Sequence, residues 1–340
     1  MHEPAPWRAL NLPPCTLGES PFWHPDEQRL YWVDIAERCV HRFCPATGCA
    51  ERWSMPSEPG CIAPVRGAGE AGEAGASGAS GSLLIALRDG VYLADHWGGP
   101  LALVARARHD VATHRFNDGK ADPCGRFWVS TINESRSSAS AELLSLAAGG
   151  LSGGEPLALR VMATGATVGN GLAWSPDART LYWADTSSHT VRAWDWHAHQ
   201  NTLCAERIFK QWPPKPTGWQ AGGLSVGSAD AGPNTAEASN VYAGRPDGAA
   251  VDVAGNYYVA MYEGACILKL SPAGHVLASL AVPAQCPTMP CLGGADGRTL
   301  YVTTARQNRP AAELARYPDS GCLFTLQVDV PGLPVNFYAA

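Results

Sequence analysis

Residues 19–35 (ESPFWHPDEQRLYWVDI) and residues 170–186 (NGLAWSPDARTLYWADT) are two copies of one pattern, and this pattern decides the fold. When the second copy is moved back by 151 positions, Trp174 falls on Trp23, and the Pro-Asp turn, the Leu-Tyr-Trp run and the closing aspartate also coincide. A turn followed by aromatic and β-branched residues is typical of a β-strand. A unit that recurs along the chain indicates a repeat architecture.

Four further copies, at residues 81–95, 117–132, 246–262 and 291–305, extend the repeat along the chain, and the copy at 81–95 is the weakest. Each contains a turn rich in Gly, Asp or Pro beside short strands, and long amphipathic helical windows are scarce. Blade-sized repeats of this kind predict a propeller. We therefore expect an all-β fold, a six-bladed β-propeller, whose last strand (322–328 or 334–338) pairs with N-terminal residues to close the ring.

The length of 340 residues and the hydrophobic content of 46% allow one large all-β domain over residues 1–340. Low-complexity segments near 67–82 and 227–240 interrupt the repeat, and we expect both to be loop insertions. The first contains a formal Gly-x-Gly-x-x-Gly, but no amphipathic helix follows it. A flexible loop is therefore favoured there over a dinucleotide-binding turn.

The charge of the chain limits the classes of binding partner that we expect. The net charge is −6 and no basic stripe occurs, so nucleic acid and anionic membranes are not expected to bind. No run approaches 18 apolar residues and no secretory signal is visible, which predicts a cytoplasmic protein. The eleven cysteines form no Cys-x-x-Cys pair, so we expect free thiols rather than a disulfide framework or a zinc site. The oligomeric state leaves no mark on the sequence.

Oxygen-bearing residues occupy one matching position in four copies, four places before Trp23, Ala121, Trp174 and Val251: these residues are Glu19, Asn117, Asn170 and Asp247. In a propeller the start of each copy lies on the innermost strand, which lines the central channel. Carboxylate and amide oxygens are the ligands that Ca²⁺, Mg²⁺ and Mn²⁺ prefer. We therefore predict a divalent metal site in the channel, beside a less polar arc where the weaker copies place Cys61 (or its neighbour Gly60) and Met289.

A simpler interpretation exists for two of these positions. Asn-Gly at 170–171 and Asp-Gly at 247–248 are also ordinary turn dipeptides. The agreement of four copies at one repeat position favours the metal site over four unrelated turns.

Four segments resemble the hallmark sequences of the senescence marker protein/gluconolactonase/regucalcin family: LGESPFWHPDEQRLYWVDI, RFNDGKADPCGRFWVSTI, GNGLAWSPDARTLYWADT and RPDGAAVDVAGNYYVAMY. The resemblance covers nearly the whole chain, and it implies a six-bladed propeller that hydrolyses small sugar lactones with one divalent ion. It leaves the ion open among Ca²⁺, Mn²⁺, Mg²⁺, Zn²⁺ and Fe²⁺. One departure is Ser20, where some relatives have glycine.

Roles for individual residues follow from the same resemblance. It implies that the metal ligands are Glu19, Asn170 and Asp247, and that the substrate is bound by Arg115, Asn117 and Glu134. A bound ion polarises a lactone carbonyl and lowers the pKa of water, and Asp247 is the expected general base. Two other functions stay open: a metal-dependent esterase or phosphotriesterase on the same scaffold, and a calcium-binding or scaffolding propeller without turnover.

The remaining motifs are weaker candidates for a functional site. His197 and His199 lie in an expected hairpin turn, which favours surface residues over a metal pair. His114 precedes Arg115, and a packed or solvated histidine is expected there. Trp212 and Trp219 flank a Pro-rich loop, and a lid over the channel is one interpretation of this loop.

Overall fold

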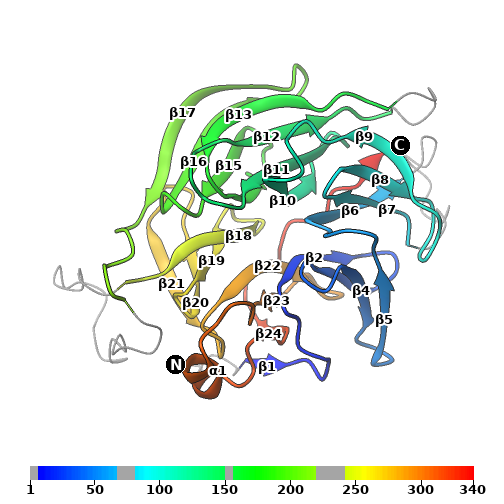
Figure 1. Ribbon diagram of the computed structural model, residues 1–340. Helices are drawn as coiled ribbons and strands as arrows, with labels where there is room; N and C mark the ends of the chain where they lie inside the picture. Colours follow the sequence, from blue (N-terminus) through cyan, green and yellow to red (C-terminus); the bar gives the residue numbers. More distant parts are fainter. Residues whose placement is uncertain (1–6, 67–80, 150–155, 220–241) are drawn as a thin grey trace.

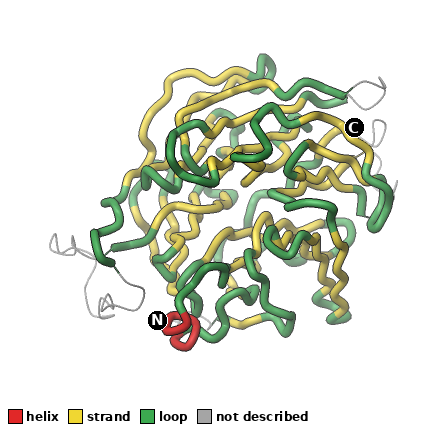
Figure 2. The backbone as a smooth tube through the Cα atoms, viewed as in Figure 1, coloured by secondary structure: helices red, strands yellow, loops and turns green. Residues whose placement is uncertain are grey.

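The computed structural model of the protein describes residues 7–66, 81–149, 156–219 and 242–340 (Figure 1). In these ranges the chain forms six small sheets arranged in a ring, which confirms the predicted all-β propeller (Figures 1 and 2). One helix, α1 (Ala311–Arg316), occurs among the described residues. The insertion expected at 227–240, and that at 67–82 apart from its last two residues, lie outside the described residues.

The blades follow one another along the chain. Blade 1 has β2 (Gly18–His24), β3 (Arg29–Asp34), β4 (Cys39–Cys44) and β5 (Cys49–Ser54), and blade 2 has β6 (Cys61–Arg66), β7 (Leu83–Leu87), β8 (Gly90–Ala94) and β9 (Ala102–Arg106). Blade 3 has β10 (His114–Ala121), β11 (Phe127–Asn133), β12 (Ala141–Leu146) and β13 (Arg160–Ala166), and blade 4 has β14 (Gly169–Trp174), β15 (Thr180–Asp185), β16 (Thr190–His197) and β17 (Thr202–Gln211). Blade 5 has β18 (Arg245–Val251), β19 (Tyr257–Tyr262), β20 (Cys266–Leu270) and β21 (Val276–Ala281), and blade 6 has β22 (Pro287–Gly293), β23 (Thr299–Thr304) and β24 (Phe324–Gln327).

The two ends of the chain complete two different blades. The N-terminal strand β1 (Arg8–Ala9) pairs antiparallel with β24 in blade 6, with Arg8 opposite Thr325. The ring therefore closes by pairing of the N-terminal strand with the 322–328 segment, which is one of the two expected pairings. The other expectation, that the tail pairs with N-terminal residues, is wrong. Strand β25 (Tyr338–Ala339) instead runs parallel to β6 of blade 2, with Tyr338 opposite Val65.

The repeated Leu-Tyr-Trp run is explained by the packing of blade on blade. Successive side chains of a strand point to opposite faces, and each second strand is covered on both faces by neighbouring blades. In β3, Tyr31 and Val33 pack in the cluster shared with blade 2, whereas Leu30 and Trp32 pack in the cluster shared with blade 6. The strand is apolar throughout because it has no solvent face.

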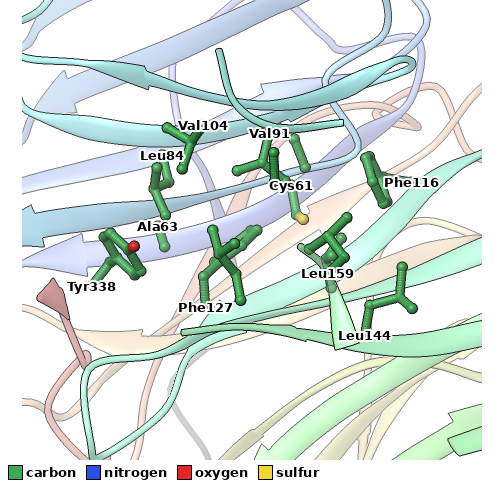
Figure 3. Packing of buried hydrophobic residues seen from close by; sticks show 14 of the residues in the cluster. Cys61, Ala63, Leu84, Val91, Val104, Phe116, Phe127, Leu144, Leu159 and Tyr338 are labelled. Atoms are coloured by element: carbon green, nitrogen blue, oxygen red, sulfur yellow. The ribbon is translucent and has the colours of Figure 1, made fainter. Parts of the chain in front are cut away.

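The interface between blades 2 and 3 shows this packing in detail (Figure 3). Phe127 of β11 and Phe116 of β10 are fully buried against Leu84 of β7 and Val91 of β8. Tyr338 of β25 packs at the edge of the same cluster. Burial of each large apolar side chain contributes about 1.5–3 kcal/mol, so the six inter-blade clusters account for much of the stability of the ring.

The two copies at 19–35 and 170–186 each contain an aspartate near their end, and this aspartate binds the backbone of the segment that leads into the blade. Asp34 accepts hydrogen bonds from the amides of Thr16 (2.7 Å) and Leu17 (3.0 Å). Asp185, at the matching position, accepts them from the amides of Thr167 (3.1 Å) and Val168 (3.0 Å). A carboxylate at this point satisfies amides that the sheet leaves unpaired.

Candidate functional site

The innermost strand of four blades carries a bulge at the predicted site residue. The ladder register shifts between Glu19 and Phe22, between Phe116 and Gly119, between Asn170 and Ala173, and between Pro246 and Ala249. A bulge bends its strand and changes the direction of a side chain. The four predicted oxygen donors accordingly line one cavity of about 410 Å³ at the end of the channel where the inner strands begin.

A chain of side-chain hydrogen bonds joins three blades across this cavity. Arg115 Nη1 donates to Asn117 Oδ1 (2.8 Å), and Asn117 Nδ2 donates to Asn170 Oδ1 (2.8 Å). Asn170 Nδ2 then donates to Asp247 Oδ1 (2.5 Å) and also to Thr186 Oγ1 (2.8 Å). All these side chains are buried. The structure therefore brings together Arg115, Asn117, Asn170 and Asp247 as a fixed polar row.

Glu19 lines the same cavity from blade 1. The next residue is Ser20, at the position where some relatives have glycine. Ser20 has a left-handed backbone (φ 49°), and Gly171, its counterpart in blade 4, has φ 59°. Such a conformation favours glycine. In blade 1 it is held by the buried Ser20 hydroxyl, which accepts a hydrogen bond from the Ile62 amide (3.0 Å).

The carboxyl groups of Glu19 and Asp247 are buried and close enough to disfavour each other's charged form. Burial, together with the negative charges of Asp247 and Asp118, holds the pKa of Glu19 well above its usual range. Burial and the charge of Asp118 likewise raise the pKa of Asp247. The neighbouring arginines are engaged elsewhere, because Arg115 pairs with Glu134 and Arg245 pairs with Glu263.

This donor set fits a hard divalent cation. Two buried carboxylates whose charges repel one another, beside amide oxygens, are what Ca²⁺, Mg²⁺ or Mn²⁺ would bind and neutralise. Within the described ranges no group of three or more His, Cys, Asp or Glu side chains is placed to hold a metal. The oxygen-bearing side chains that could contribute to such a site are those of Glu19, Asp247 and Asn170, which line the cavity together.

Glu134 lies beside the row rather than in it. Its carboxylate forms a two-pronged ion pair with Arg88 (2.9 and 3.0 Å) and lies 3.7 Å from Arg115 Nε. It lines an adjoining cavity of about 300 Å³, which shares Arg115 and Arg136 with the main one. Glu134 therefore holds Arg115 in place from the edge of the site.

The cavity wall also contains a cluster of charged residues that the sequence did not predict. Glu263, in the turn between β19 and β20, is buried and contacts Lys215 (2.8 Å), Arg309 (3.1 Å) and Arg245 (2.9 Å). Burial raises the pKa of Glu263, but the hydrogen bond from Lys215 and the charge of Arg245 outweigh it and leave the pKa below its usual range. Lys215 and Arg309 lie in connections between strands, where the repeat gives no register. No sequence signal marks them.

The weaker copies do not form the expected arc of the site. Cys61 packs in the cluster between blades 2 and 3, and Met289 lines a second cavity, of about 280 Å³, at the opposite end of the channel. That expectation is wrong, and blade 6 differs in its bulge: only one residue is left unpaired there, between Pro287 and Met289, whereas the bulges of blades 1, 3, 4 and 5 leave two. The second cavity is mostly lined by apolar residues such as Trp23 and Trp174, and it lacks the oxygen donors of the first.

The remaining expectations concern residues outside the cavity. His197 and His199 are exposed beside the β16–β17 turn, as expected. The partly buried His114 side chain contacts the Ser140 hydroxyl (2.8 Å). Trp212 packs between blades 4 and 5, and Trp219 contacts Tyr242 edge to face. The cavity wall therefore receives Lys215 of this loop and neither tryptophan. All eleven cysteines are free thiols. None of the described helical residues forms a segment long and apolar enough to cross a membrane.

Comparison with known proteins gives matches over nearly the whole chain. The profile of the family described as SMP-30/Gluconolactonase/LRE-like region matches residues 17–306. A 6-deoxy-6-sulfogluconolactonase of Pseudomonas putida is 36% identical over 330 residues, which are 96% of each chain. Pentonolactonase XacC of Haloferax volcanii is 29% identical over 94% of each chain. The crystal structure of regucalcin from Agrobacterium tumefaciens, titled a calcium-binding protein, has the same fold (TM-score 0.79, 22% identity, 97% and 96% covered).

Proposed function

Because the chain belongs to the SMP-30/gluconolactonase/LRE-like family, we propose that it is a lactonase that hydrolyses a small sugar lactone with the help of one divalent metal ion. The observation that carries the proposal is the convergence of Glu19, Asn170 and Asp247 on one cavity from three blades. Two relatives that match over nearly their full length are named as sugar lactonases, which supports the reaction class.

Glu19, Asn170 and Asp247 would hold the ion. Their oxygens suit Ca²⁺, Mg²⁺ and Mn²⁺ best, and regucalcin of Agrobacterium tumefaciens, which has the same fold, is described as a calcium-binding protein. When bound, such an ion polarises the lactone carbonyl and makes water more acidic.

Asp247 is the proposed general base. Asn170 holds its Oδ1 at 2.5 Å, which fixes the carboxylate and leaves Oδ2 for a proton. Asp247 accepts the proton that water loses as the water oxygen bonds to the carbonyl carbon. When the ring ester bond breaks, the proton passes to the departing ring oxygen, which becomes a hydroxyl. The product is the open-chain aldonic acid.

Arg115 and Asn117 are the proposed substrate-binding residues. Arg115 Nη1 is committed to Asn117 Oδ1 and to the Phe116 carbonyl, so the plane of the guanidinium is fixed before substrate arrives. Its other nitrogens are the proposed donors for sugar hydroxyls, and Glu134 lies 3.7 Å from one of them, Nε, at the edge of the site. A fixed guanidinium loses little conformational entropy when it binds.

The test is acid release from a panel of pentonolactones and hexonolactones, corrected for spontaneous hydrolysis. Chelation should abolish turnover, and one of Ca²⁺, Mg²⁺, Mn²⁺, Zn²⁺ or Fe²⁺ should restore it. An ion that binds without turnover of any lactone would show a calcium-binding propeller instead. Turnover of aryl esters or phosphotriesters in place of lactones would show the esterase alternative.

A further inference from the structure

The main cavity carries an excess of positive charge in a chain whose net charge is −6. Its lining contains three anionic side chains (Glu19, Asp247 and Glu263) and five cationic ones (Arg115, Arg136, Lys215, Arg245 and Arg309). A divalent ion at the proposed site would take up the charge of Glu19 and Asp247. The five cations would then face Glu263 alone within the cavity lining.

The cluster around Glu263 does not cancel its own charge. Arg309 is shared with Glu313, which it contacts through two hydrogen bonds (2.7 and 2.6 Å). Three cations are therefore balanced by two carboxylates, and one positive charge remains beside Lys215 and Arg245. Arg245 Nε is buried and has no hydrogen-bond partner in the described part of the chain. A buried donor without a partner is costly, so the chain leaves the guanidinium of Arg245 incompletely satisfied.

Arg136 adds a second unbalanced charge from two blades away. It lies in the turn after β11 of blade 3, is exposed, and lines both the main cavity and the adjoining one. No ion pair to it occurs among the described side chains, whereas the other four arginines and lysines of the lining each have a carboxylate partner. A neutral sugar would leave these charges without partners as it displaced water from the cavity.

We infer, on the premise of the proposed lactonase function, that the preferred lactone carries a strongly acidic substituent remote from its ester bond, and that Lys215, Arg245 and Arg136 bind it. A sulfonate, a phosphate or a carboxylate has the required chemistry. Each offers several oxygens to a guanidinium, and charge-assisted hydrogen bonds of this kind are about twice as strong as neutral ones.

The experiment compares kcat/KM for four gluconolactones that differ only at carbon 6, which carries a hydroxyl, a sulfonate, a phosphate or a carboxylate. At least one anionic lactone should exceed the neutral one tenfold or more, and the highest value identifies the group. Raising the salt concentration should reduce this ratio, because salt screens exposed charges.

Two variants test the residues. Arg136→Gln and Lys215→Gln should each lower the anionic-to-neutral ratio about tenfold, while thermal unfolding confirms that each variant is folded. Arg207→Gln removes an arginine that pairs with Asp195 on the outer part of blade 4, and it should leave the ratio unchanged. Lys215 lies in the connection between blades 4 and 5, and Arg136 lies in a turn of blade 3, so a failure of one variant to fold leaves the other as the test.

The outcomes separate the two proposals. If the neutral lactone is hydrolysed as efficiently as all three anionic ones, the inference is overturned and the lactonase function stands. If the anionic preference exists but survives both substitutions, the assignment to these residues is overturned. If no lactone is hydrolysed with any metal, the proposed function fails first, and the inference that rests on it falls with it.

Discussion

Asn170 Nδ2 lies 2.5 Å from Asp247 Oδ1, and this hydrogen bond joins the innermost strands of blades 4 and 5. The same amide group donates to Thr186 and accepts from Asn117, so its orientation is fixed by three partners. Asp247 is therefore positioned by two blades rather than by one loop. A carboxylate held in this way is in place before substrate arrives, which is what general-base catalysis requires.

Asp247→Asn should separate catalysis from folding. The substitution keeps the shape of the side chain but removes the proposed base and a proposed metal ligand, so we expect kcat/KM for lactones to fall at least 10³-fold. The free energy of unfolding of the metal-free protein should be unchanged or higher, because a buried charge that repels Glu19 is gone. Asp195→Asn, at an exposed ion pair, is the control and should keep full activity. A variant with the wild-type rate would reject the assignment of Asp247.

Metal binding should raise the thermal stability of the protein. A ligand that binds only the folded state at 100 times its Kd stabilises it by about 2.7 kcal/mol. Adding the activating ion should therefore raise the Tm of the wild-type protein and raise it much less in Glu19→Gln, which lacks one carboxylate of the set. Glu206→Gln, at an exposed pair with Arg192, should respond like the wild type. An equal rise in Glu19→Gln would show that the ion binds elsewhere.

The repeat explains why much of the site could be predicted from sequence. A blade must present apolar side chains to both neighbours, so the strand after each turn keeps its pattern, and this pattern fixes the register of the inner strand. Four oxygen donors at one register position therefore predicted one cavity, and Glu19, Asn117, Asn170 and Asp247 do line it. Their roles as ligands and substrate contacts stay predictions.

The residues that could not be predicted lie in connections between strands, where the repeat pattern does not fix their positions. Lys215, Glu263 and Arg309 belong to connections whose lengths differ from blade to blade, and only the folded ring brings them together. Met289 shows the other limit, because the bulge of blade 6 leaves one residue unpaired where those of blades 1, 3, 4 and 5 leave two, and Met289 lines the cavity at the opposite end of the channel. Sequence patterns report strand periodicity well, but they do not report the exact position of a bulge.

Gly171→Ala should disturb both stability and the site. Gly171 has φ 59°, and a Cβ there would lie 2.5 Å from the Tyr257 hydroxyl and 3.1 Å from the Asp247 carbonyl oxygen. We expect a loss of at least 2 kcal/mol beyond that of Gly98→Ala, measured by urea unfolding, because a buried overlap adds to the backbone strain. Gly98 is the matched control, since it also has a positive φ (77°) but no atom within 4 Å of its Cβ position. Equal losses in the two variants would show that the blade 4 inner strand relaxes freely.

Stability should fall below neutral pH through histidines that are wholly or partly buried. His41 stacks on Trp32 (ring centroids 4.9 Å apart), and burial lowers its pKa from 6.5 to about 4. Burial also lowers the pKa of His24, His109 and His189. Between pH 6.5 and 4 the unfolded chain binds a proton at His41 that the folded protein does not. The contribution of His41 is therefore complete above pH 6.5 and is lost as the pH falls towards 4.

His41→Phe isolates this effect because a phenyl ring keeps the stacking and does not titrate. Between pH 7.5 and 5 the wild-type protein should lose about 2 kcal/mol more unfolding free energy than His41→Phe, as measured by urea unfolding. His199→Gln, on the exposed turn after β16, is the control and should follow the wild type. If His41→Phe loses as much stability as the wild type, His41 is protonated in the folded protein and its burial against Trp32 does not hold it neutral.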